Sequence, residues 1–187
     1  MKLETSFLAF FVALTFACHS SDGDAPAPAP TPEPPPVLVD ASFGEVGNVH
    51  AFGDIWTGGQ PTPADLERLP EIGVRTVINL RRDEEMTELD EGAILASVGI
   101  DYVSIPWAGP AQLTDEIFDR CRDALESAER PLFFHCKSAN RVGAVWIPWR
   151  VLDQGATFEE ALDEAKRIGM RTPGYETRAR EYVDARR

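Results

Sequence analysis

The chain has 187 residues and a formal net charge of -13 at pH 7, a length suited to one domain of ordinary size. Its acidity excludes long-range attraction to nucleic acid and to anionic bilayers, so any anion site must be a local concentration of positive charge. Beyond Cys18 only Cys121 and Cys136 remain, which is too few for a disulfide framework.

The N-terminal residues have the pattern of an export signal. Lys2 precedes an apolar run from Phe7 to Ala17, which is shorter than the ~20 residues needed to cross a bilayer. Thr15 and Ala17 are small, and Cys18 directly follows Ala17, which resembles a bacterial lipobox. We therefore interpret residues 1–17 as a lipoprotein-like signal peptide and Cys18 as a lipidation site, with a plainly cleaved, secreted form as the alternative.

A segment rich in proline, alanine and acidic residues follows at 18–40. Such a composition cannot bury a core, so we expect a disordered, semi-extended linker before a folded domain at 41–187. The expected localisation is that of an exported bacterial protein, periplasmic or at the cell surface. It would meet a membrane only through the lipid anchor at Cys18.

The folded part alternates apolar, β-branched stretches with amphipathic ones. Thr62 and Pro63 mark a helix start, and Gly73 and Gly99 mark helix ends. Strands are expected at 46–56 (one or two), 74–80, 100–107 and 131–135. Helices are expected at 62–72, 84–98, 114–128, 142–152, 158–168 and 174–185. This alternation predicts an α/β domain with a central, mostly parallel sheet flanked by helices.

The stretch HCKSANR lies between the last expected strand and an apolar helix. A turn of this kind aims backbone N–H groups into one concavity, and the helix N-terminus adds partial positive charge. The concavity binds a compact anion and stabilises a thiolate at its start, while an arginine can grip two anion oxygens. Cys136 is thus the candidate nucleophile and Arg141 the anion clamp, with an inert buried thiol as the alternative. The candidate substrate-binding residues are His135, Lys137, Ser138, Ala139 and Asn140.

His135-Cys136 followed by a short loop and Arg141 resembles the signature of the cysteine-dependent phosphatases, the tyrosine and dual-specificity group. Two stretches more closely resemble the bacterial phosphatase-like domain of beta-lactamase-hydrolase-like proteins. They are GGQPTPADLERLPEIGVRTVINLRRDEE and HCKSANRVGA. The similarity runs from about Ile55 to Leu152. It implies a phosphatase-type α/β fold in which Cys136 is the nucleophile and the amides of residues 137–141 form the cradle.

The loop departs from the phosphatase pattern in three ways. Four residues separate Cys136 from Arg141, where phosphatases have five and rhodanese-type sulfurtransferases have four. Ala139 stands where such loops generally have glycine, which costs on the order of 1 kcal/mol if its φ is positive. Val142 replaces the usual serine or threonine, so the hydroxyl that helps the thiolate leave is missing.

A phosphatase also uses a carboxylic acid to protonate the departing oxygen, from a loop before the cysteine. The matching segment, 106–112, contains no acid. Asp115 is the nearest candidate, although an acidic residue at a helix start is normal as a dipole partner. Arg81, at the end of the 74–80 strand, is a candidate for anion recruitment, with a solvated strand end as the alternative.

The function that these residues indicate is a cysteine-dependent phosphatase hydrolysing phosphate monoesters through a cysteinyl-phosphate. Two alternatives stay open: a rhodanese-like sulfurtransferase carrying a persulfide on Cys136, or a catalytically degenerate anion-binding module. The expected partner is a phosphorylated small molecule or protein, and nucleic acid is not expected. None of these functions calls for a metal or an organic cofactor.

Overall fold

The computed structural model describes residues 35–187, so the expected signal peptide, Cys18 and the linker up to residue 34 lie outside the described residues. The fold begins before residue 41. Leu38 is 5% exposed and joins the core, and β1 (Val39–Asp40) pairs with the next strand. Across 35–187, every helix is too short or too polar to span a bilayer.

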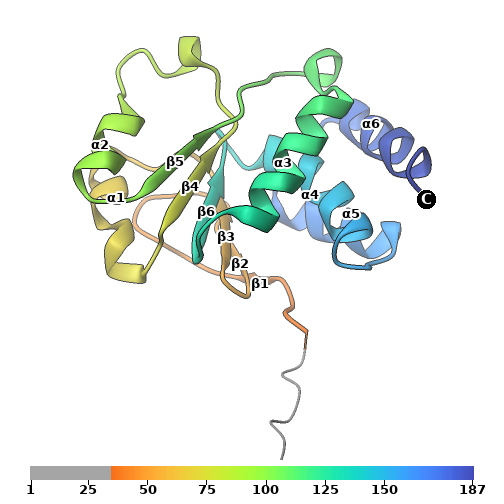
Figure 1. The fold of residues 1–187 in the computed structure, drawn as a ribbon, viewed down its shortest axis with the longest axis horizontal. Coiled ribbons are helices and arrows are strands. Elements are labelled where there is room, and N and C mark those ends of the chain that lie inside the picture. Colours follow the sequence, from red (N-terminus) through yellow and green to blue (C-terminus); the bar gives the residue numbers. More distant parts are fainter. Residues whose placement is uncertain (1–34) are drawn as a thin grey trace, which may run out of the picture. The chain divides into compact units, whose positions relative to one another are not determined.

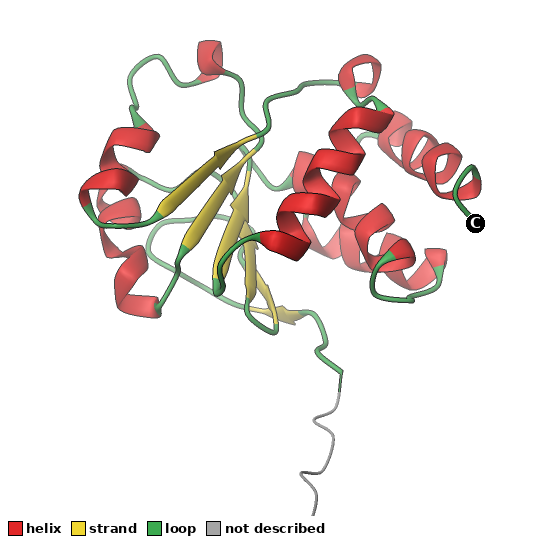
Figure 2. Cartoon of the chain, viewed as in Figure 1, coloured by secondary structure: helices red, strands yellow, loops and turns green. Residues whose placement is uncertain are grey.

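The sheet has six strands in the order β1-β2-β3-β6-β4-β5 (Figure 2). Beyond β1, they are β2 (His50–Phe52), β3 (Ile55–Gly58), β4 (Thr76–Asn79), β5 (Asp101–Ser104) and β6 (Leu132–His135). The pairs β3–β6, β6–β4 and β4–β5 are parallel, while β1, β2 and β3 pair antiparallel. The predicted α/β domain with a mostly parallel sheet is confirmed.

Helices cover both faces of this sheet (Figure 1). They are α1 (Pro63–Arg68), α2 (Glu91–Ser97), α3 (Asp115–Ser127), α4 (Asn140–Leu152), α5 (Phe158–Ile168) and α6 (Pro173–Asp184), with 3-10 turns η1 (Leu69–Ile72), η2 (Asp83–Glu85) and η3 (Pro110–Gln112). Because side chains alternate along a strand, Val77 and Phe133 enter the apolar cluster under α1 and α2, while Ile78 and Phe134 enter the cluster under α3–α6.

The sequence signals for helix ends agree with the backbone. Thr62 and Asp65 form a reciprocal capping box at the start of α1. Gly73 and Gly99 adopt positive φ values of 81° and 74°, the left-handed conformation that glycine reaches without a steric penalty.

The helix predicted at 84–98 is wrong over its first half. The chain forms only the short turn η2 there, and α2 begins at Glu91 with the Asp90 side chain capping the N–H of Ala93. In this stretch the side chain of Glu85 pairs with the distant Arg141 instead of lying on a helix face.

Crossovers on opposite faces place β6 at the centre of the sheet. The connection from β3 to β4 runs through α1 on one face and leaves room for one strand between them. The connection from β5 through α3 runs on the other face and fills that room with β6. Ligands bind such sheets where the crossovers diverge, at the carboxyl ends of the strands, and Cys136 directly follows β6 there.

The buried helix predicted at 142–152 is confirmed as α4, which runs through Pro148 and is buried nearly all round. It packs closely on α5. A methyl group added at Gly143 would lie 2.6 Å from the Ala165 carbonyl oxygen and 2.7 Å from Cβ of Met170. Since both are below normal contact distances, only glycine lets the two helices approach this far.

Candidate active site

The segment from Cys136 to Arg141 forms a tight loop between β6 and α4. Cys136 is 1% exposed. Ala139, the residue before α4, has φ 61° and ψ 0°, so the left-handed turn anticipated for a glycine is made by an alanine. The start of α4 has no side-chain cap, which leaves its first N–H groups directed at the loop and available to an anion.

Neighbouring segments hold the outer edge of this loop. The N–H of Gln60 donates to the Lys137 carbonyl at 3.3 Å, and Asn48 Nδ2 donates to the Ser138 carbonyl at 3.2 Å. A methyl group on Gly59 would come within 3.2 Å of the Lys137 oxygen, and one on Gly169 within 3.1 Å of the Ser138 oxygen. The loop is therefore clamped by close backbone packing on two sides.

Arg141 is fixed by four hydrogen bonds. Its Nη1 donates to the carbonyl oxygens of Leu80 (3.0 Å) and Trp107 (2.8 Å), and Nη1 and Nη2 donate to the two carboxylate oxygens of Glu85 at 2.9 and 2.7 Å. Arg141 as a whole residue is 7% exposed. This fork-to-fork pairing sets the plane of the guanidinium beside Cys136.

The charges of this pair stabilise one another. Burial alone would raise the pKa of Glu85, but hydrogen bonds and charge from Arg141, with help from Arg82 and Arg81, lower it from 4.5 to about 2. Burial likewise disfavours the charged form of Arg141, yet the carboxylate of Glu85 and the sulfur of Cys136 raise its pKa overall. Arg141 is therefore a permanent cation held at the loop.

A second polar group lies behind the loop rather than in it. His135 is 0% exposed, and its Nε2 lies 2.7 Å from Oε1 of Glu91, another buried side chain. Oε2 of Glu91 accepts hydrogen bonds from Gln60 and Asn79 at 3.2 Å each. A residue so enclosed cannot contact a substrate, so the structure corrects the role proposed for His135 from substrate binding to support of the loop.

Arg81 is also turned inward. Its Nη1 donates to Oε1 of Gln60 at 2.7 Å, its Nη2 donates to the Glu85 carbonyl, and its Nε lies 3.6 Å from a Glu85 carboxylate oxygen. These contacts make Arg81 a link between Gln60 and the segment of Glu85. Direct anion recruitment by Arg81 is not supported.

The segment 106–112 contacts Arg141, whose Nη1 donates to the Trp107 carbonyl. The rings of Trp107 and Tyr175 meet edge to face at a centroid distance of 5.2 Å. Burial raises the pKa of Tyr175, and the Gly109 backbone and Arg141 partly oppose this. Tyr175 thus packs on the residue whose carbonyl binds Arg141.

Asp115 is engaged away from the loop. It is the first residue of α3, and its carboxylate lies 3.1 Å from Arg178 and 3.3 Å from Arg186, both on or after α6. Thr114, the residue before it, caps the helix. These contacts match the helix-start interpretation of Asp115, and within residues 35–187 its carboxylate forms no hydrogen bond or ion pair with Cys136 or Arg141.

The side chains of the other candidate loop residues, Lys137, Ser138 and Asn140, differ in their exposure and in their hydrogen bonds. Lys137 is exposed, whereas Asn140 is occupied, with Nδ2 donating to Thr172 at 2.9 Å and Oδ1 accepting from the N–H of Arg171 at 2.8 Å. Arg171 Nη2 also donates to Ser138 Oγ at 2.8 Å.

Sequence reasoning missed Glu85, Glu91, Arg171 and Tyr175. The charged stretch RRDEE, directly after a buried strand, could have identified Glu85 as a residue at the carboxyl end of the sheet.

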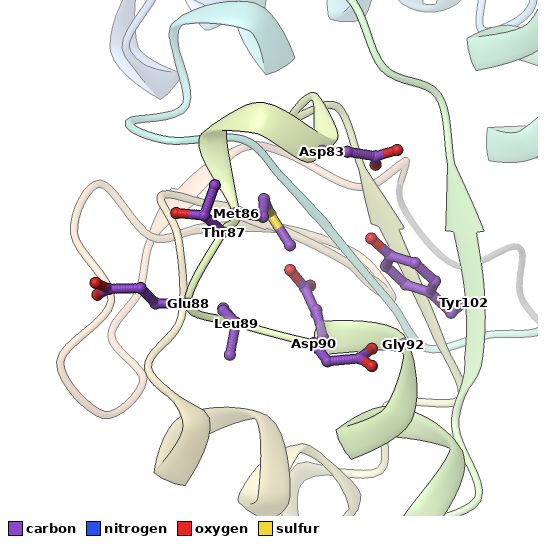
Figure 3. A pocket seen from close by; sticks show the side chains of 9 residues that line it. Asp83, Met86, Thr87, Glu88, Leu89, Asp90, Gly92 and Tyr102 are labelled. Carbon is purple, nitrogen blue, oxygen red and sulfur yellow. The ribbon is translucent and has the colours of Figure 1, made fainter.

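A cavity of about 540 Å³ lies on the α2 side of the sheet edge (Figure 3). Its lining includes the acidic residues Asp83, Glu88 and Asp90, together with Tyr102. Their negative charge disfavours anions, and Cys136 is not among the lining residues. The reactive loop and this cavity are thus separate features.

The comparisons with known proteins agree with this geometry. The family described as "DSP-PTPase phosphatase fused to NAD+ Kinase" matches residues 31–182. The beta-lactamase hydrolase-like protein of Agrobacterium fabrum is 31% identical over 115 residues, 59% of this chain and 26% of that protein. The chain thus spans about a quarter of the length of that relative.

Solved structures share the fold. The core catalytic domain of a PP-IP phosphatase from S. cerevisiae, in complex with citrate, has a TM-score of 0.64 and 20% identity, covering 78% of this chain and 91% of that one. TpbA of P. aeruginosa, in complex with pTyr, has a TM-score of 0.59 and 23% identity, covering 79% and 87%. With a family match along most of its length and this fold around Cys136, the chain belongs to the DSP-PTPase phosphatase family named above.

Proposed function

We propose that the protein is a cysteine-dependent phosphatase that hydrolyses phosphate monoesters through a cysteinyl-phosphate intermediate. The observation that carries this proposal is the loop itself. Cys136 ends the central strand, Ala139 turns the chain left-handed onto an uncapped helix start, and Arg141 is held beside the cysteine. N–H groups and a fixed cation around a thiol suit attack on a phosphoryl group.

The reaction proceeds in two displacements. The Cys136 thiolate attacks phosphorus, so an S–P bond forms while the bond from phosphorus to the ester oxygen breaks and leaves its electron pair on that oxygen. The loop amides and Arg141 stabilise the charge on the other phosphoryl oxygens. Water then attacks phosphorus, the S–P bond breaks, the thiolate returns, and the water's proton passes to solvent as phosphate leaves.

Leaving-group chemistry limits the substrates. Neither the segment 106–112 nor Val142 supplies a carboxylic acid or a hydroxyl to the reacting atoms. A positioned acid is worth ~10²–10⁴-fold in rate when the departing oxygen needs a proton. Aryl esters and phosphoanhydrides, which leave without one, are therefore proposed as better substrates than alkyl phosphates.

The structurally similar proteins support a phosphorylated substrate, but they do not distinguish a small molecule from a protein. One is a PP-IP phosphatase and another binds pTyr. A phosphorylated small molecule or a phosphorylated protein is accordingly the proposed partner class.

A second candidate, sulfur transfer, is favoured by one observation: only four residues separate Cys136 from Arg141. In this reaction Cys136 would take the outer sulfur of thiosulfate with release of sulfite, and the persulfide would pass that sulfur to cyanide as thiocyanate. A module that binds anions without turnover is the remaining alternative.

The test is a paired assay on the full-length protein, with one arm for release of phosphate from an aryl phosphate and one for sulfur transfer from thiosulfate to cyanide. Cys136→Ser removes the nucleophile, and Cys121→Ala is the matched control because that thiol is buried on α3. We expect phosphate release that Cys136→Ser abolishes and Cys121→Ala retains. Sulfur transfer without phosphate release would replace the proposal with its rival, and silence in both arms would leave the binding module.

A further inference from the structure

The segment 169–172, between α5 and α6, packs against the outer edge of the reactive loop. The Arg171 guanidinium reaches Ser138 Oγ through Nη2 at 2.8 Å and the Gly169 carbonyl through Nη1 at 3.3 Å. Asn140 also holds this segment, because its Oδ1 accepts from the backbone N–H of Arg171 and its Nδ2 donates to the Thr172 hydroxyl. Arg171 is therefore held at a defined place beside the loop although its residue is exposed.

The charge of Arg171 is not neutralised there. Most arginines of this acidic protein have a carboxylate partner, but Lys137, Lys166 and Arg171 form no ion pair within residues 35–187. Lys137 is in the reactive loop itself, and Lys166 is in the last turn of α5, which leads into Arg171. A protein with a net charge of -13 thus gathers unpaired cations at this edge.

A cavity of about 220 Å³ adjoins Arg171. Its lining is Lys166, Met170, Arg171, Thr172, Pro173 and Glu176. Two cations face one carboxylate in this lining, so the net charge of the cavity is positive.

We propose that Arg171, with Lys166 and Lys137, forms a second anion-binding subsite that takes a second phosphate group of a small-molecule substrate whose first phosphate lies over Cys136. This inference rests on the proposed function and narrows it to substrates with two phosphate groups. Ser138 is two residues from Cys136, so its Cα lies no more than ~7 Å away. The Arg171 guanidinium lies 2.8 Å from the hydroxyl of that serine, so its planar fork can bind two oxygens of a phosphate next to the reactive loop.

The test measures binding rather than turnover, so that it is independent of the phosphatase assay. Full-length Cys136→Ser protein is titrated by calorimetry with propyl phosphate and with propane-1,3-diyl bisphosphate. We expect the bisphosphate to bind at least ~10-fold more tightly, which corresponds to about 1.4 kcal/mol. Adding Arg171→Ala should remove most of this preference, while Arg171→Lys should restore part of it because the charge returns without the fork.

Arg75→Ala is the matched control. Arg75 is also exposed and has no ion-pair partner among the described residues. It precedes the amino end of β4, whereas the reactive loop follows the carboxyl end of β6. Its removal should leave the preference for the bisphosphate unchanged.

Equal affinities for the two probes would overturn the subsite, as would an Arg171→Ala variant that weakens both probes by the same factor. If turnover fails but the Arg171-dependent preference appears, the subsite stands and the phosphatase proposal falls. If turnover succeeds and the preference is absent, only the subsite falls.

Discussion

Glu85 connects the electrostatics of Arg141 to the stability of the fold. Its pKa in the folded protein, about 2, lies below its ordinary value of 4.5. A carboxyl group of this kind stabilises the folded state fully above the ordinary pKa, and the contribution disappears as pH falls through the folded one. The pair should therefore add stability above pH 4.5 and lose it between pH 4.5 and 2.

Replacing Glu85 by glutamine should lower the free energy of unfolding at pH 7 by on the order of 1–3 kcal/mol. The difference from wild type should shrink as pH falls from 4.5 to 2, because wild type alone loses the ionised carboxylate. Urea denaturation at a series of pH values measures this. Glu84→Gln, in the exposed neighbouring position, should show little change. A difference that persists at pH 2 would refute the assignment.

Asp115 tests the assignment of the general acid. Because its carboxylate pairs with Arg178 and Arg186, Asp115→Asn should change kcat on an aryl phosphate less than 3-fold and should lower thermal stability slightly. Steady-state kinetics over a series of leaving groups is the measurement. A loss of ~10²-fold or more that grows with the basicity of the leaving group would identify Asp115 as the acid after all.

The strained turn at the start of α4 is an element whose cost can be weighed. Glycine at 139 would relieve about 1–2 kcal/mol of left-handed strain, but it would lose about 0.8 kcal/mol for a buried methyl group and up to 1 kcal/mol in chain entropy. These terms nearly cancel. Ala139→Gly should therefore change the free energy of unfolding by less than ~1 kcal/mol.

The same substitution at Ala144, buried in the right-handed interior of α4, removes a methyl group with no strain to relieve. Ala144→Gly should destabilise the protein by about 2 kcal/mol. Chemical denaturation of both variants provides the comparison. Equal destabilisation by the two would mean that Ala139 carries no strain.

Elements with a local cause were predictable from the sequence. Thr62 and Gly73 mark the two ends of the α1–η1 segment, and the β-branched run at 74–80 predicts β4. Cys136 and Arg141 stand out because they lie between an expected strand and an apolar helix. The failures share a different cause. Glu85 and Glu91 lie in the stretch predicted as a single helix, yet their partners, Arg141 and His135, are 56 and 44 residues away. No local pattern encodes such pairings.

At the scale of the whole molecule, the sheet order explains why the site is assembled from distant segments. Placing β6 between β3 and β4 brings the turn after β3, the η2 segment after β4 and the loop after β5 to one edge around Cys136. Strand alternation predicted the class of fold, but the order of strands depends on which face each crossover takes. That choice is made by packing, so Gln60 and Trp107 could not be assigned to the site in advance.

Gly143 has an implication for how the site can vary. Since α5 rests on α4 at backbone distance and continues directly into the segment bearing Arg171, the spacing of these two helices sets how far that segment stands from the reactive loop. A single methyl group at Gly143, two residues after Arg141, would push Ala165 and Met170 outward and that segment with them. Under the proposed function, the size of substrate that Arg171 and the loop can hold together would depend on one helix contact, and it could change without altering one residue of the loop.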